Sequence, residues 1–249
     1  MRPAAIFTTA AVLIPALTAS LASAAPSIPA YVSAAVADSA RPAEDKQRDA
    51  DRKPAETLAF AGVKPGDTVI ELAPGKGYYT RLLSAVVGPK GKVYAVGGQP
   101  KPDAPPPPVQ AIAADPHYGN VTVSLQKIAD LKLPQGVDLV WTTQNYHDLH
   151  NLHDVDLAKI NSAVFAALKP GGTYFVLDHA AEPGSGARDT GTLHRIDEET
   201  VKQEVTGAGF KLVGESDILR NKSDPHTAKV FDPEIRGHTD QFVLKFKKP

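Results

Sequence analysis

The chain has 249 residues, of which 42% are hydrophobic and 22% charged, the composition of an ordinary globular protein. Its 27 basic and 28 acidic residues leave a formal net charge of −1, which gives no indication of binding to nucleic acid or to an anionic membrane. Because the sequence contains no cysteine, disulfides, thiol catalysis and cysteine-bound zinc are excluded.

The N-terminus has the pattern of a cleaved export signal. Arg2 precedes an apolar stretch at residues 4–17, and Ala22-Ser23-Ala24 supplies the small residues of a cleavage site. A membrane anchor is the alternative, but the stretch is short and is interrupted by Pro15. We therefore expect residues 1–24 to be removed and the mature protein to be exported, to the periplasm, without a membrane attachment.

Residues 25–62 form an N-terminal segment that reads as helical from Ile28 to Arg52. It is rich in alanine at first and strongly charged over residues 44–53. Opposite charges stand three and four residues apart, which is typical of a solvent-exposed helix. The alternative is that this segment forms a lid over a ligand site of the main domain.

Residues 63–249 alternate predicted strands with predicted helices. Helices are expected directly after the first strand, before the fifth, and from Asp197 onward, where an N-cap residue precedes two acidic residues. This alternation indicates a mostly parallel sheet with both faces covered. No helix is evident between Gly214 and Gln241, so the last strand is expected to return antiparallel. The strands are expected at residues 68–72, 92–96, 120–125, 138–142, 173–177, 210–214 and 241–247.

One segment interrupts this alternation. Six prolines occur in the nine residues from Pro100 to Pro108, within an insertion at residues 99–109. Such a run favours an extended, solvated loop. A binding site for a partner is the alternative.

A glycine-rich turn follows the first predicted strand. Glu71 stands near the end of that strand, and Pro74-Gly75-Lys76-Gly77 leads into the next helix. Ligands of open parallel sheets bind beyond the carboxyl ends of the strands, and glycines let the backbone approach them. The spacing fits no dinucleotide fingerprint, since Thr80 replaces the third glycine, and no P-loop, which needs Gly-Lys-Ser/Thr. We therefore expect the turn to receive a carboxylate.

Together these features resemble the class I S-adenosylmethionine-dependent methyltransferases. The resemblance rests on the glycine turn and on Lys169-Pro170-Gly171-Gly172 before the fifth strand, and it covers roughly residues 40–249. Residues 48–61, Asn145-Tyr146-His147-Asp148 and residues 192–210 are further similar to the exported bacterial "predicted methyltransferases". The resemblance implies a Rossmann-like α/β fold with a seven-stranded, mostly parallel sheet, an antiparallel last strand and helices on both faces.

The resemblance also implies S-adenosylmethionine as the cofactor and a methyl transfer to a small-molecule acceptor, which the sequence does not identify. Glu71 would organise the methionine end of the cofactor, through water or the amino group. The residues implied to bind the cofactor are Glu71, Ala73, Pro74, Gly75, Lys76, Gly77, Tyr78, Gly97, Gln126 and Asn145.

The sequence departs from these enzymes on the adenosine side of the implied site. They carry an acid at the end of the second strand that holds the ribose hydroxyls, whereas this strand ends Val96-Gly97-Gly98-Gln99. Gln126 stands where an acid often accepts from the adenine amine, and its amide oxygen can accept one hydrogen bond. An exported ligand-binding protein that keeps the fold but lacks the chemistry is therefore an alternative function.

Histidines and aspartates follow the fourth and fifth predicted strands. Since these strand ends meet at the edge that carries the glycine turn, we expect His147 to act as a general base, oriented by Asp148 or Asp178. His179 is the second candidate base, and Tyr146 is expected to shape the acceptor pocket. These catalytic candidates are Tyr146, His147, Asp148 and His179.

A metal-dependent enzyme is a further alternative for the same residues. His147, Asp148, His179 and His194 offer nitrogen and oxygen ligands suited to zinc, iron or manganese. Their spacing, however, matches no two-histidine signature such as His-Glu-x-x-His. The sequence therefore assigns no metal ligand.

Overall fold

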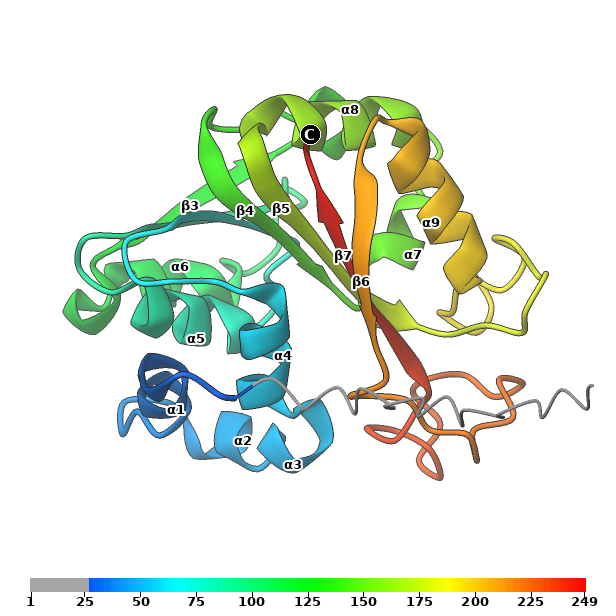
Figure 1. The fold of residues 1–249 in the computed structure, drawn as a ribbon, viewed down its shortest axis with the longest axis horizontal. Coiled ribbons are helices and arrows are strands. Elements are labelled where there is room, and N and C mark those ends of the chain that lie inside the picture. The colour runs from blue at the N-terminus through cyan, green and yellow to red at the C-terminus, as the bar shows by residue number, and fades with distance from the viewer. Residues whose placement is uncertain (1–26) are drawn as a thin grey trace, which may run out of the picture.

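Seven strands form one sheet in the order β3-β2-β1-β4-β5-β7-β6 (Figure 1). The structure, a computed structural model, describes residues 27–249, so the predicted export signal at residues 1–24 lies outside the described residues. Neighbouring strands are parallel except for β7, which runs antiparallel to β5 and β6. The predicted fold class is confirmed. The strands are β1 (Thr68–Leu72), β2 (Lys92–Gly98), β3 (Val121–Gln126), β4 (Val137–Thr143), β5 (Leu168–His179), β6 (Lys211–Ser216) and β7 (Gln241–Lys247).

Strand β5 begins earlier than predicted, at Leu168 instead of Thr173. Val137 of β4 lies opposite Leu168, while Leu139, two residues later, lies opposite Thr173. Residues 169–172 therefore stand opposite the single residue Asp138, and this stretch of β5 bulges out between two paired stretches. The predicted turn is an irregularity within the strand, and the other six strands match their predicted ranges to within two residues.

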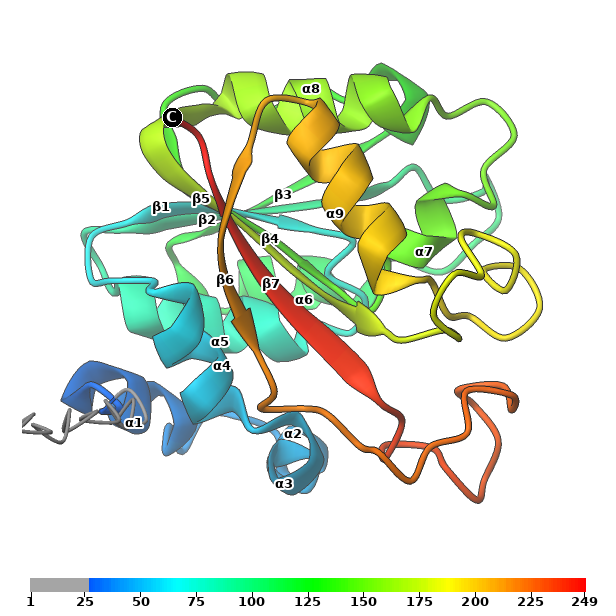
Figure 2. The same cartoon turned by 45° about the vertical axis from the view of Figure 1, so that its right-hand side comes forward.

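Helices cover both faces of the sheet (Figures 1 and 2). One face packs against α4, α5 and α6, with α1 (Ala30–Val36) outside them against α4 and α5, and the other face packs against α7, α8 and α9; each side has its own cluster of buried apolar side chains. As predicted, the side chain of Asp197 caps α9, accepting from the backbone N–H of Glu199. The helices of the main domain are α5 (Tyr78–Val87), α6 (Pro108–Ala114), α7 (Tyr146–Leu149), α8 (Leu157–Ala167) and α9 (Glu198–Gly207).

The N-terminal segment is helical but not continuous, so the prediction of one helical stretch from Ile28 to Arg52 is wrong in that respect. The first break comes where the Asp38 side chain accepts from the Ala40 N–H in a turn, and Pro42 follows. The segment consists of α1 (Ala30–Val36), α2 (Ala43–Lys46), α3 (Asp49–Arg52) and α4 (Pro54–Ala61). Within residues 27–249, no helix is long and apolar enough to cross a membrane.

The proline-rich insertion lies largely at the surface, as predicted. Residues 99–106 are exposed, and no helix or strand is formed between Gly98 and Pro107. Pro108 begins α6, because a proline at the first helical position loses no hydrogen bond.

Candidate functional site

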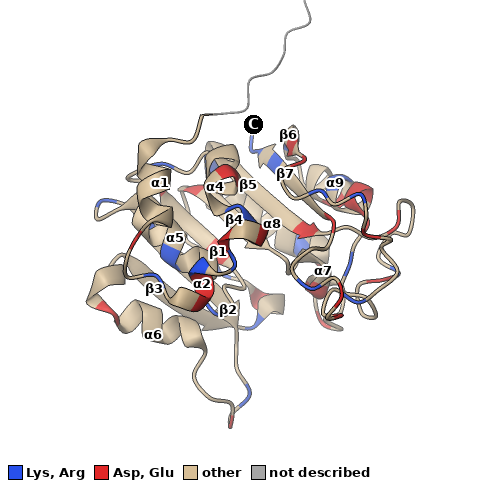
Figure 3. Cartoon of the chain, turned by 90° about the horizontal axis from the view of Figure 1, so that it is seen from below, with Lys and Arg blue, Asp and Glu red and all other residues tan. Residues whose placement is uncertain are grey.

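A cavity of about 960 Å³ lies at the carboxyl ends of β1, β2 and β4. The glycine turn lines one side of it, and Arg48 and Arg52 of the N-terminal segment line another. Figure 3 views the molecule from this side and shows α2, with its charged residues, in front of the sheet. The segment therefore covers the cavity, as the lid alternative requires, although its opening and closing stay a prediction.

The glycine turn has the backbone geometry that only small residues accommodate well. Gly77 has φ of +79°, and a Cβ atom there would lie 2.0 Å from Cδ1 of Ile112. Gly75 has φ of +57°, but no heavy atom lies within 4 Å of the position of its missing Cβ. Ala73, with φ of +49°, is a non-glycine residue in the same left-handed region. Glycine is therefore favoured at position 77 by its left-handed backbone and by the nearby Ile112 methyl group, whereas at position 75 the missing side chain leaves the cavity open.

Glu71 is a buried carboxyl group beside this turn, and it lines the cavity. The Thr80 hydroxyl donates to its Oε2 over 2.5 Å. Burial raises the pKa of Glu71 to about 7, although Thr80 and the more distant charge of Arg52 oppose this shift. Within the described chain, no basic side chain lies within ion-pair distance of Glu71. The site therefore favours a cation beside Glu71 once it ionises.

Arg52 faces the same cavity from the N-terminal segment. Its Nη2 donates to Oε1 of Gln144 over 2.6 Å, and its guanidinium lies 4.7 Å from the ring centre of Tyr78 and 5.7 Å from that of Tyr79. Burial lowers the pKa of Arg52. Among residues 27–249, no carboxylate lies within 4.0 Å of it. An anion in the cavity would supply the missing counter-charge.

One ion pair within the N-terminal segment and two contacts with α5 hold this segment against the main domain. Arg41, whose side chain is fully buried, donates to both oxygens of Asp49 over 2.6 and 2.9 Å. The Tyr78 hydroxyl donates to Asp49 over 2.7 Å, and Arg81 pairs with Asp45 over 3.0 Å. The predicted cofactor residue Tyr78 thus contacts the covering segment through its hydroxyl and lines the cavity with its ring.

The opposite side of the cavity carries no acid from the sheet. Gly97 and Gly98 extend β2 beyond its predicted end, and they line the cavity together with Leu125. Gln126 does not line it. Its Oε1 accepts from the backbone N–H of Lys132 over 2.7 Å, and its Nε2 donates to Ser124, so its amide closes the loop after β3. The expectation that Gln126 meets an adenine ring is therefore not supported by its placement.

His147 is the second residue of α7, the short helix that follows β4. Its Nδ1 lies 2.8 Å from Oδ1 of the buried Asp178, and its Nε2 lies 3.3 Å from Oδ1 of Asp148 and 3.4 Å from Nδ1 of His194. Burial alone would lower the pKa of His147, but Asp178 and Asp148 outweigh it and raise the pKa to about 10. Asp148 lines the main cavity, whereas His147 does not.

The sequence was compared with known proteins. No family model matches it. It is 29% identical over 137 residues to the demethylmenaquinone methyltransferase of Symbiobacterium thermophilum, covering 52% of this chain and 49% of that protein. It is 26% identical over 206 residues to the ubiquinone/menaquinone biosynthesis C-methyltransferase of Vibrio cholerae, covering 76% and 65%. The chain thus spans about half to two thirds of the length of these curated relatives.

Solved structures share its architecture. A S-adenosylmethionine-dependent methyltransferase from Aquifex aeolicus has a TM-score of 0.58 at 20% identity, over 84% of this chain and 99% of that one. The geranyl diphosphate C-methyltransferase from Streptomyces coelicolor has a TM-score of 0.58 at 15% identity, over 87% and 88%. The chain has the class I methyltransferase fold. The glycine turn and the cavity thus lie at the carboxyl ends of the strands of this fold.

Three further predicted site residues of this methyltransferase fold lie in different surroundings. Asn145 lines the cavity, and its Nδ2 donates to the carbonyl of Leu72 over 3.1 Å, which ties the ends of β1 and β4 together. Tyr146 lies in the core on the other face, where its hydroxyl donates to Glu204 over 2.9 Å. The expectation that Tyr146 shapes the acceptor pocket is not supported by this position. His179 lies outside the main cavity and faces a smaller one.

His179 lines a second, smaller cavity of about 150 Å³, which shares Arg48, Arg52 and Gln144 with the main one. Its Nδ1 lies 2.7 Å from the Thr239 hydroxyl. Burial lowers the pKa of His179 to about 4, so this ring is neutral at pH 7. The first and the second candidate base that the sequence offers therefore differ in charge at pH 7.

Sequence reasoning missed Arg52 and Gln144 as site residues of the methyltransferase fold. Arg52 stands in a run of alternating charges, where nothing marks one cation as facing a cavity. Gln144 has φ of +57°, an uncommon value that the sequence does not reveal. The lid alternative for residues 25–62 is the prediction that pointed to this segment, without naming Arg52.

Proposed function

We propose that the protein is an S-adenosylmethionine-dependent methyltransferase that acts on a small-molecule acceptor. One observation carries the proposal: Arg52 and Glu71 offer two unmatched charges on the wall of one cavity, beside the glycine turn. The cofactor ends in an α-amino acid, which carries a carboxylate and an ammonium group. A cavity with one positive and one ionisable negative group is complementary to that end.

The turn completes the methionine side of the proposed site. The carboxylate is expected between the Arg52 guanidinium and the backbone of Gly75, where the absence of a side chain leaves room for a ligand. The ammonium group is expected beside Glu71. Asn145 fixes the end of β1, so that this half of the cavity is formed before the ligand arrives.

Methyl transfer depends above all on placing the acceptor in line with the sulfonium methyl group. We place the acceptor between Asp148 and the smaller cavity, which Val230 and Phe231 line with apolar side chains. With a pKa of about 10, His147 carries a proton at neutral pH, and it would have to lose this proton before it could act as the predicted general base. A neutral His179 is the other candidate.

An exported ligand-binding protein remains the second candidate function, because no sheet residue supplies an acid on the adenosine side. Calorimetry of the purified protein with S-adenosylmethionine and S-adenosylhomocysteine tests the proposal. Dissociation constants in the micromolar range for both are expected. Binding in the millimolar range or none would reject the methyltransferase, and binding without methyl transfer to any oxygen, nitrogen or carbon acceptor would favour the binding protein.

Export is part of the proposal and rests on the pattern of residues 1–24. The expected mature N-terminus lies at Ala25 or Pro26. N-terminal sequencing of protein recovered from the periplasm tests this cleavage. Recovery of the uncut chain from the cytoplasm would reject it.

A further inference from the structure

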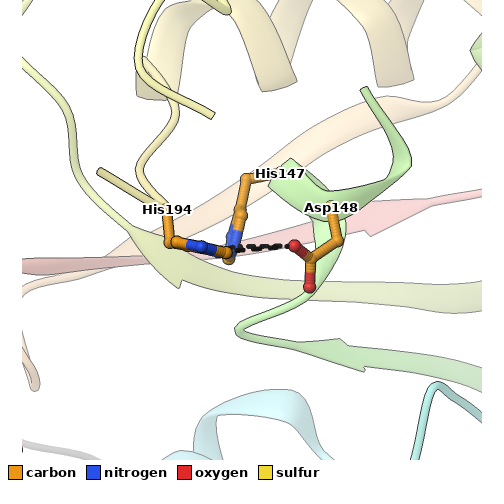
Figure 4. Close-up of side chains that lie close together, drawn as sticks. All are labelled: His147, Asp148 and His194. Carbon is orange, nitrogen blue, oxygen red and sulfur yellow. Dashed lines mark hydrogen bonds and ion pairs between the residues drawn. The ribbon is translucent and has the colours of Figure 1, made fainter. Parts of the chain in front are cut away.

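Three side chains from the segments that follow β4 and β5 point toward one another (Figure 4). His147 and Asp148 stand side by side on α7, and His194 comes from the loop before α9. Nε2 of His147 lies 3.3 Å from Oδ1 of Asp148, and Nδ1 of His194 lies 3.4 Å from that nitrogen and 3.5 Å from that oxygen. The three ligand atoms therefore form a nearly equilateral triangle.

This triangle has the dimensions of one face of a metal coordination sphere. Nitrogen and oxygen ligands lie about 2.0–2.1 Å from a bound zinc ion, so two ligands of a tetrahedral site are about 3.4 Å apart. The separations of 3.3 to 3.5 Å match this value without any movement of the side chains. A hydrogen bond between His147 and Asp148 alone would not require His194 to lie at the same distance from both of these side chains.

The buried ring of His147 is hydrogen-bonded to Asp178 on the side away from the triangle. Nδ1 of His147 lies 2.8 Å from Oδ1 of Asp178, whose other oxygen accepts the backbone N–H of His147. Asp178 also accepts from the backbone of His179 and is fully buried. A carboxylate behind a histidine in this way fixes the ring and leaves its other nitrogen free to bind an ion.

His194 is held in position from its C-terminal side. Arg195 is fully buried, pairs with Asp224 over 2.8 Å and donates to the carbonyl of Ala180. Ile196 forms a parallel bridge with Ala180 at the end of β5. The His194 ring also lies 4.9 Å from that of Phe231. These contacts bring His194 to α7 across 46 residues of sequence, so the triangle is a product of the fold.

We propose that His147, Asp148 and His194 bind one divalent transition-metal ion. Two imidazoles and one carboxylate suit zinc, iron, cobalt or manganese, whereas magnesium and calcium prefer oxygen ligands alone. His179, which the sequence offered as a fourth ligand, is not part of the set, because its ring lines the smaller cavity and its centre lies 6.2 Å from that of His147.

The ion has open coordination positions on the side of Asp148. The Asp148 side chain is 53% exposed and lines the main cavity, while the His147 side chain is 3% exposed. An oxygen group of the acceptor would bind there, since a three-ligand site keeps positions for substrate. This role rests on the proposed function, but the binding of the ion does not.

The test is a metal titration of the purified protein, produced without a polyhistidine tag and treated with a chelator. Co²⁺ is followed by its visible absorption, which differs between four- or five-coordinate and fully hydrated ions, and Zn²⁺ is followed by calorimetry. One equivalent of each is expected to bind. We expect His194→Ala to weaken Zn²⁺ binding at least 100-fold, and Asp178→Asn to weaken it about 10- to 100-fold without touching the ion.

His153→Ala is the matched control, because His153 is an exposed histidine of the loop after α7 and lies outside the triangle. It should leave Zn²⁺ binding unchanged. The proposal is overturned if no single equivalent saturates, or if His194→Ala and His153→Ala bind Zn²⁺ equally well. Calorimetry with S-adenosylmethionine on the same sample distinguishes failure of the proposed function, since the metal titration contains no cofactor.

Discussion

The two sides of the main cavity are built differently. On the side of β1, a left-handed glycine turn, a buried carboxyl group and a cation without a counter-ion surround the space. On the side of β2 and β3, the wall consists of Gly97, Gly98 and Leu125. The side chain of Gln126, which the sequence offers as a ligand for adenine, is instead hydrogen-bonded to the backbone of Lys132 in the loop after β3. The first side is therefore complementary to charged groups of a ligand, whereas the second side can select a ligand mainly by its shape.

This difference teaches where affinity for the proposed cofactor must arise. Hydrogen bonds to charged groups contribute about 1.5–3 kcal/mol each, whereas contact with glycine and leucine selects little beyond size. The methionine side should therefore dominate binding. Acids do line the cavity from the covering segment, at Glu44 and Asp45, but Asp45 already pairs with Arg81.

The largest effect is expected from Gly75→Val. The new side chain would project into space that is empty in the protein, so cofactor binding should weaken more than 100-fold. A valine at positive φ also costs about 1–3 kcal/mol of stability. Gly136→Val is the control, since Gly136 has φ of +74°, no heavy atom within 4 Å of its missing Cβ, and no place in the cavity. Calorimetry and thermal unfolding of both variants separate the two effects; equal cofactor binding in both would show that the site is misplaced.

Arg52→Met should have the next largest effect. Methionine keeps much of the contact with the Tyr78 ring but removes the charge, so binding of S-adenosylmethionine should weaken about 10- to 100-fold. Arg52→Lys should lie between, because it keeps the charge without the planar fork. Lys46→Met removes an exposed charge of the same segment and should change little. If Arg52→Met and Lys46→Met bind the cofactor alike, the assignment of the carboxylate to Arg52 fails.

The sequence predicts the side of β1 better than it predicts the rest of the site. The turn at Gly75 and Gly77 is a local signal, because its backbone conformation depends on adjacent residues. The mostly parallel sheet is predicted equally well, because the alternation of strands and helices can also be read from neighbouring residues. The turn at Asp38 and the following Pro42, by contrast, divide the predicted helical stretch between its alanine-rich part and its charged part. Local rules therefore identify elements more securely than their limits.

Contacts between distant segments were beyond the sequence. Arg52 meets Gln144 across 92 residues, and His147 meets His194 across 47. Tyr146 shows the converse error: it is adjacent to His147, but on a short helix neighbouring side chains point in different directions, and Tyr146 enters the core. Proximity in sequence to a site residue does not place a side chain in the site.

Binding of the cofactor should depend on pH through Glu71. Its pKa of about 7 in the free protein means that the group is mostly protonated at pH 6 and must lose a proton to meet an ammonium group. The dissociation constant should therefore fall from pH 6 to pH 7.5, by at most about eight-fold, because an α-amino group of pKa about 7.7 already loses part of its own charge by pH 7.5. Calorimetry in buffers of different ionisation enthalpy should detect release of a proton.

Glu71→Gln is the control for this dependence. It should bind the cofactor more weakly at pH 7.5 and show a flat profile over the same range. The free protein gives an independent check. Because the folded pKa of Glu71 is raised from 4.5, the unfolding free energy should fall as pH rises from about 4.5 through 7, by about 3 kcal/mol at most, and the variant should lack this slope. A wild-type binding profile as flat as that of the variant would remove Glu71 from the ammonium site.

The smallest effect is expected where the cavity is least polar, and it is a gain. Gly97→Asp places a carboxylate at the end of β2, where the resemblance implies an acid that holds the ribose hydroxyls. The new Cβ would lie 3.1 Å from Cδ2 of Leu125, which must shift by a few tenths of an ångström, so part of the gain is lost. Binding of S-adenosylmethionine should tighten about five-fold, less than one unopposed charge-assisted hydrogen bond would give. Gly97→Asn, with the same size and no charge, should bind no more tightly than the wild type. If both variants weaken binding equally, the side of β2 does not receive a ribose, and the difference between the two sides of the cavity reflects a ligand other than the proposed cofactor.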